Sequence, residues 1–143
     1  MKYFILPLLI FSLVSCSTSP HLEVTNQYWS RKDLASFIVN TPDPSKNDPI
    51  FGQRLIMSWS VSKKTFDSGP LELLIKVKLK NNEQIDQIIP LKETSGSYYF
   101  PIYGDDFTKK GGLLSYFVEL KSNGETIGVC RHKLWVEPII FSS

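Results

Sequence analysis

Residues 71–80 read LELLIKVKLK, and the alternation within this stretch decides the fold. One face is apolar and consists of Leu71, Leu73, Ile75, Val77 and Leu79. The other face is mostly charged and consists of Glu72, Leu74, Lys76, Lys78 and Lys80. Alternation with a period of two is the pattern of a β-strand that is buried on one face and exposed to solvent on the other. The lysines are expected to form a solvated face, and a basic stripe facing acidic headgroups is the alternative.

Six further segments carry strand patterns on either side of this one. They are residues 34–39, 54–62, 83–91, 97–103, 113–121 and 126–137. Asn81 and Asn82 tolerate positive φ, so they are expected to make a tight turn into residues 83–91. Pro90 cannot donate a backbone hydrogen bond, so this segment is expected to lie at the edge of a sheet or to end at Pro90.

The last two segments flank Asn123-Gly124, a strong signal for a two-residue hairpin turn. A regular ladder beyond that turn fixes which residues face each other. The expected pairs are Ser122–Glu125, Leu120–Ile127, Val118–Val129, Phe117–Cys130, Tyr116–Arg131, Ser115–His132 and Leu113–Leu134. A β-bulge would shift the pairs that lie farther from the turn.

About seven short strands without a long amphipathic helix predict an all-β fold, an antiparallel β-sandwich. The pattern over residues 34–138 resembles immunoglobulin-like and fibronectin type III domains. This resemblance implies that Trp59 is the core tryptophan and that Tyr116 forms the tyrosine corner. A small lipocalin-like barrel is the main alternative, and it would need more strands.

The N-terminus has the pattern of an export signal. Lys2 precedes an apolar run, YFILPLLIFSLV at residues 3–14, that is shorter than the roughly 20 residues needed to cross a bilayer. The following Leu-Val-Ser-Cys at residues 13–16 resembles the lipobox of bacterial lipoproteins. The resemblance implies that Cys16 carries a diacylglyceryl thioether and, after cleavage before it, an acylated amine, for example with palmitate. A plain secretory signal and a buried N-terminal element are the alternatives.

These features predict three parts of the chain: a signal peptide at residues 1–15, a lipidated N-terminus with a short tether at 16–28, and a β-sandwich domain at 29–143. Ser17 replaces the Asp that often retains lipoproteins in the inner membrane, so the outer membrane of the cell envelope is expected. Residues 41–44, 52–55 and 131–135 also resemble small lipoproteins of chlamydia-like bacteria. That resemblance implies an envelope location and no particular chemistry.

The composition and motifs give little support for catalysis. A net charge of +2 does not favour nucleic acid as a partner. No cofactor-binding or metal-binding motif is present, and we expect neither a cofactor nor a metal. Cys130 and His132 lie two residues apart on a predicted strand and so face the same way. We expect them to pack structurally, and a hydrolase that uses His132 with Cys130 or a serine is the least favoured alternative.

Basic and aromatic residues provide the candidate binding sites. Arg131, Lys133 and Trp135 are expected to share one strand face, where a cation beside aromatic rings can bind carbohydrate, phosphate or a partner loop. The alternative is that the basic stems cover the rim of the sandwich while Trp135 packs in the core. Tyr99 and Tyr103, if they point outward, form a second candidate patch.

The sequence thus predicts a membrane-anchored, non-catalytic binding or assembly module with an envelope protein as its partner. A structural envelope lipoprotein without a dedicated ligand is the alternative.

Overall fold

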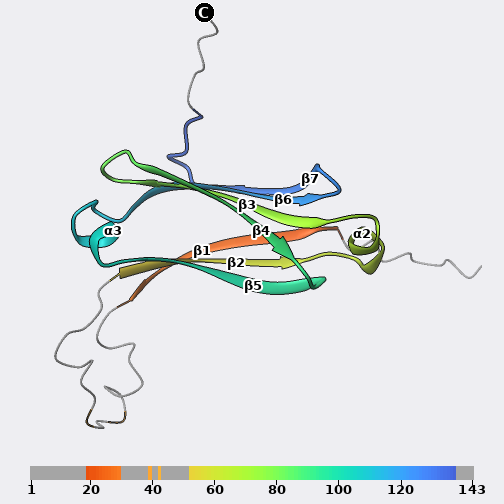
Figure 1. Ribbon diagram of the computed structural model, residues 1–143, viewed down its shortest axis with the longest axis horizontal. Coiled ribbons are helices and arrows are strands. Elements are labelled where there is room, and N and C mark those ends of the chain that lie inside the picture. Colours follow the sequence, from red (N-terminus) through yellow and green to blue (C-terminus); the bar gives the residue numbers. More distant parts are fainter. Residues whose placement is uncertain (1–18, 30–38, 40–41, 43–51, 138–143) are drawn as a thin grey trace, which may run out of the picture.

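The computed structural model describes residues 19–29, 39, 42 and 52–137. In these residues seven strands and two short helices follow one another (Figure 1). They are β1 (His21–Trp29), β2 (Gly52–Ser60), α2 (Lys63–Asp67), β3 (Leu71–Leu79), β4 (Gln84–Leu91), β5 (Ser95–Tyr103), α3 (Asp105–Thr108), β6 (Leu113–Ser122) and β7 (Glu125–Arg131). The segment 34–39, predicted as a strand, lies outside the described residues except for Val39, which is in a turn.

The strands form two antiparallel sheets stacked face to face (Figure 1). One sheet has the order β1-β2-β5, and the other has the order β4-β3-β6-β7. The predicted all-β antiparallel sandwich is therefore confirmed. Lettered A to G in chain order, the sheets are ABE and DCFG. Compared with the constant-type immunoglobulin order of ABED and CFG, the fourth strand has joined the other sheet.

The core lies between the sheets and is built around the inward rows of β2 and β3. Leu73, Ile75 and Val77 on β3 are fully inaccessible to solvent, as are Leu55 and Met57 on β2. Full burial of one such side chain contributes about 1.5–3 kcal/mol of transfer free energy. The alternation that predicted residues 71–80 as a strand is thus the alternation between this core and the outer face of the sheet.

Trp59 is part of the hydrophobic core, at the end of the sandwich near α2. Its prediction as the core tryptophan is confirmed. Its side chain is buried, and its indole N–H donates a hydrogen bond to the carbonyl oxygen of Glu93 (3.1 Å). Gly96 lies opposite it on β5, where a Cβ atom would come within 2.8 Å of the indole ring. A glycine is therefore required at this position for the ring to lie against the β5 backbone.

The two prolines within strands lie at sheet edges. Pro90 is in β4 and Pro101 is in β5, and each of these strands is the last of its sheet on one side. A missing N–H is tolerated there because no further strand needs it. The predicted edge position of residues 83–91 is confirmed.

The hairpin of β6 and β7 turns at Asn123 and Gly124 as predicted, with φ angles of 51° and 80°. Its first pairs, Ser122–Glu125 and Lys121–Thr126, follow a regular ladder. The register then shifts by one residue, so that Leu120 faces Gly128 and Phe117 faces Arg131. The predicted pair Ser122–Glu125 is confirmed, whereas the pairs predicted for Leu120, Val118 and Phe117 are wrong by one residue because β7 contains a bulge. The predicted pair Leu113–Leu134 does not form, because β7 ends at Arg131.

Gly128 follows the bulge in β7 and lies where this strand contacts β1 of the other sheet. A Cβ atom on Gly128 would lie 3.4 Å from the Cβ of Leu22 on β1, so β7 and β1 approach closely. This contact closes one side of the sandwich. The opposite side lies between the edge strands β4 and β5.

Strand β1 corrects the predicted boundary between tether and domain. The sequence predicts a tether at residues 16–28, but β1 begins at His21 and pairs with β2 along its whole length. Leu22 and Val24 pack against the core, whereas Glu23 and Thr25 are exposed. A short edge strand with a polar outer face resembles a tether in sequence. Only four residues therefore lie between Cys16 and the start of the folded domain.

At the end of the sandwich that carries α3, Lys110 forms two ion pairs. The Nζ atom of Lys110 lies 2.8 Å from carboxylate oxygens of both Glu83 and Asp106. The hydrogen bond from Lys110 lowers the pKa of Glu83. These contacts join the β3–β4 turn to the connection between β5 and β6.

Adjacent leucines on β3 test the assignment of the two faces. We expect Leu73→Ala to destabilise the fold by about 2–5 kcal/mol, because its cavity would lie in the core. The matched control is Leu74→Ala on the outer face, which should cost less than about 1 kcal/mol. Urea denaturation of the two variants measures both values. Equal losses would contradict the assignment.

Candidate functional site

The structure separates the three residues of the first predicted binding patch. β7 ends at Arg131, and the chain then turns, with the Trp135 amide donating to the carbonyl oxygen of His132 (2.9 Å). Arg131 and Lys133 are exposed, whereas Trp135 is buried. The prediction that all three share one strand face is wrong, because the chain leaves the sheet after Arg131.

Trp135 covers the outer face of the four-stranded sheet and does not enter the space between the sheets. Its ring stacks on Phe117 of β6, with the ring centres 5.6 Å apart and the planes at 26°. The ammonium group of Lys76 lies 5.9 Å from the centre of the Phe117 ring. The alternative interpretation placed Trp135 in the core. Trp135 is indeed buried, but it packs on the outer face of a sheet and not between the two sheets.

The second predicted patch does point outward, on the three-stranded sheet. Tyr99 is 54% exposed and Tyr103 is 57% exposed. The guanidinium of Arg54 on β2 lies 5.5 Å from the centre of the Tyr99 ring, and its Nε donates to Oε1 of Gln27 on β1 (2.7 Å). Contacts across three strands therefore fix this surface. We call Arg54, Tyr99 and Tyr103 the tyrosine face.

Cys130 and His132 both pack near Tyr116. Cys130 is half-buried with a free thiol, and its contact adds to the effect of burial in raising the pKa of Tyr116. The His132 ring centre lies 5.4 Å from that of Tyr116. Tyr116 therefore interacts with β7 and not with backbone upstream of β6, so the expected tyrosine corner is absent from the described residues.

The hydrogen bonding of His132 determines where its proton lies. Its Nδ1 atom accepts a hydrogen bond from the amide of Leu134 (3.2 Å). In the neutral imidazole the proton must then be on Nε2, which acts as a donor. Abstraction of a proton by Nε2 would require the other tautomer and the loss of this bond.

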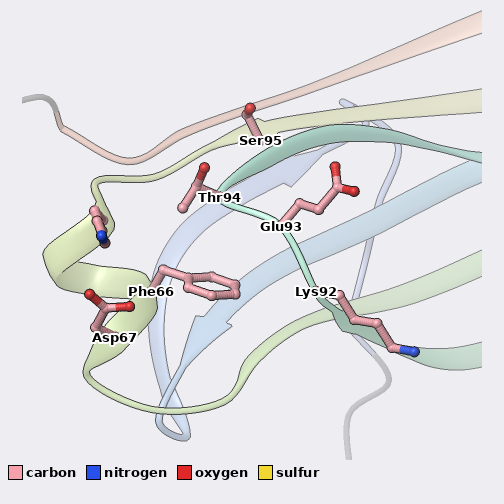
Figure 2. Close-up of a pocket in the computed structure, with 7 residues that line it drawn as sticks. Phe66, Asp67, Lys92, Glu93, Thr94 and Ser95 are labelled. Carbon is pink, nitrogen blue, oxygen red and sulfur yellow. The ribbon is translucent and has the colours of Figure 1, made fainter.

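A hollow that was not predicted from the sequence lies beside α2 (Figure 2). Its volume is about 510 Å³. It is lined by Lys63, Phe66, Asp67, Lys92, Glu93, Thr94 and Ser95. The Phe66 ring points from α2 toward the chain that joins β4 to β5. We call this the α2 pocket.

Hydrogen bonds hold the two walls of the α2 pocket in place. Ser62 caps α2 by accepting a bond from the Thr65 amide (3.1 Å), and Ser122 of β6 donates to the Thr65 carbonyl (3.1 Å). The Val61 amide donates to the Thr94 carbonyl (2.8 Å). One bond thus joins α2 to β6, and another joins the segment before α2 to the connection between β4 and β5. The helix itself has only five residues.

The charges of the α2 pocket are of both signs. Within the described part of the chain, the charged groups of Lys63, Asp67, Lys92 and Glu93 take part in no ion pair or hydrogen bond. A second hollow of about 300 Å³ shares Lys92 and Glu93 with it and continues toward Trp59 and Tyr98. The open side between β4 and β5 is therefore hollowed near α2.

Among the described residues, no three or more His, Cys, Asp or Glu side chains are grouped so that they could hold a metal ion. No helix in this part of the chain is long and apolar enough to cross a membrane.

Comparison with known proteins gives no relative. No family model, no curated protein and no solved structure matches this chain. Every functional assignment for this chain must therefore come from its own residues.

Substitutions of Trp135 test its role as a cover for the sheet. Its buried indole Nε1 has no hydrogen-bond partner among the described residues. We therefore expect Trp135→Phe to keep the stack on Phe117 and to leave stability unchanged or slightly raised. Trp135→Ala should cost about 1–3 kcal/mol through lost packing, measured by urea denaturation. Equal effects of the two substitutions would refute the stacking role.

Proposed function

We propose that this chain is a lipid-anchored protein of the cell envelope, in the outer membrane, that acts as a non-catalytic binding or assembly module. The observation that supports the proposal is the short stretch of sequence between Cys16, the expected lipidation site, and the folded domain. Four residues separate Cys16 from β1, and five residue steps span at most about 17 Å. Acyl chains on Cys16 anchor firmly, because each buried CH₂ contributes about 0.8 kcal/mol.

The anchor joins the sandwich at the end that carries α2. His21, the first residue of β1, pairs with Ser60, and Ser60 pairs with Ser95 on the far side of β2. Ser60 also precedes α2 by only two residues. Figure 1 shows β1 beginning beside α2, while α3 lies at the opposite end of the sandwich. An anchored domain would therefore hold its α2 end toward the membrane.

The tyrosine face is the surface best suited to a protein partner. It follows β5 away from the α2 end, so that Tyr99 and Tyr103 lie about 13 Å and 26 Å beyond Ser95. Tyrosine and arginine are enriched at protein interfaces because they provide large contact areas. The contact with Tyr99 already restricts the Arg54 side chain. Less side-chain conformational entropy is therefore lost when a partner binds.

Lipidation and partner binding can be tested separately. Intact mass measurement of the protein from envelope membranes should show a chain that begins at Cys16 and carries acyl groups. Cys16→Ala should leave the membrane fraction. An unmodified Cys16 in membrane-bound protein would contradict the anchoring.

Cross-linking of the anchored protein tests the tyrosine face. The pair Tyr99→Ala and Tyr103→Ala should reduce a specific cross-linked product at least about tenfold, through lost hot-spot contacts. The matched control pair is Ile88→Ala and Val129→Ala, which are exposed apolar residues on the outer face of the other sheet. Equal loss with both pairs would argue against the assignment.

A further inference from the structure

We propose that the α2 pocket binds the phosphoethanolamine headgroup of a phospholipid in the membrane that holds the anchor. The proposal rests on the proposed lipidation of Cys16, which would bring the pocket to the membrane. Its occupant is one kind of lipid headgroup, which carries a phosphate and an ammonium group.

The position of the pocket is the first argument. Ser95 lines the pocket and lies two strands from His21 in the row His21–Ser60–Ser95. Strands are about 4.8 Å apart, so the start of β1 is only about 10 Å from the pocket wall. The tether adds at most about 17 Å to Cys16. An anchored chain therefore cannot carry this pocket far from the lipid headgroups.

The charges are the second argument. Each wall of the pocket carries one cation and one carboxylate: Lys63 and Asp67 lie on α2, and Lys92 and Glu93 lie on the chain between β4 and β5. None of the four charged groups is used by another side chain in the described residues. A purely anionic headgroup would meet two carboxylates, and a free cation would meet two lysines. A zwitterion matches both signs.

The remaining lining residues fit the same ligand. The hydroxyl groups of Thr94 and Ser95 can donate to phosphate oxygens, and the Phe66 ring offers a face to an ammonium group. The volume of about 510 Å³ lies within the range of roughly 300–1,000 Å³ that is usual for small-molecule sites. The pocket is open to its surroundings, as a site for part of a membrane lipid must be.

Titration of the mature lipidated protein in a phosphorus-free detergent tests the proposal. The probe is glycerophosphoethanolamine, observed by phosphorus NMR, with glycerophosphoglycerol and inorganic phosphate as comparison ligands observed in the same way. Ethanolamine, which contains no phosphorus, is compared through its ability to displace glycerophosphoethanolamine. We expect saturable binding of glycerophosphoethanolamine and at least about tenfold weaker binding of the other three. Equal binding of inorganic phosphate, or of glycerophosphoglycerol, would overturn the proposal in favour of a simple anion site.

Two pairs of variants assign the charges. Lys63→Ala with Lys92→Ala should weaken binding of glycerophosphoethanolamine at least about tenfold. Asp67→Asn with Glu93→Gln should also weaken it, while raising the affinity for glycerophosphoglycerol toward the same level. All four side chains are exposed, so the fold should tolerate these changes.

The matched control uses an ion pair at the other end of the sandwich, Lys109→Ala with Asp105→Asn, which should leave binding unchanged. No saturable binding, or binding that none of the pocket variants alters, would overturn the proposal. Such a result would leave lipidation intact, because the mass of Cys16 is measured independently. An unmodified Cys16 with normal headgroup binding would instead refute the anchor and keep the pocket.

Discussion

The packing of the inward row of β3 against the inward row of β2 is the contact on which the rest of the structure depends. Leu73 and Ile75 from one sheet and Leu55 and Met57 from the other lose all contact with water. Each of these strands is flanked by strands on both sides, β4 and β6 for β3, and β1 and β5 for β2. Loss of this contact would leave two sheets with exposed apolar faces.

The sandwich has two unlike sides because of how its edge strands meet. Gly128 lets β7 approach Leu22 of β1 closely, and this side is closed. On the other side β4 and β5 carry prolines and are joined by the chain that lines the α2 pocket. β1 begins beside α2, so the start of the folded domain and the α2 pocket lie at the same end of the fold.

Much of the sheet structure was predictable because strands with one wet face alternate in sequence. Residues 71–80 and the Asn123-Gly124 turn gave the central strand and the last hairpin correctly. β1 was missed because a polar edge strand needs only Leu22 and Val24 to meet the core, and two apolar residues give no visible period. The bulge in β7 was not predicted, because the Asn123-Gly124 turn specifies only the pairs nearest to it, which do follow a regular ladder.

The candidate sites were less predictable than the strands. The outward direction of Tyr99 and Tyr103 followed from alternation within β5. Trp135 was misplaced because period two was extended past Arg131, where the chain leaves the sheet. The α2 pocket joins residues 63–67 to residues 92–95, which are brought together only by the folding of both sheets. No spacing in the sequence signals such a site.

The proposed lipid anchor and the proposed pocket together predict which end of the domain faces a membrane. Spin labels at Lys64→Cys in α2 and Lys109→Cys directly after α3, in a Cys130→Ser background, can report this orientation in the lipidated protein on vesicles. A relaxation agent confined to the headgroup region should broaden the label at position 64 strongly and that at position 109 weakly. Equal broadening at both positions, or the reverse order, would contradict the account.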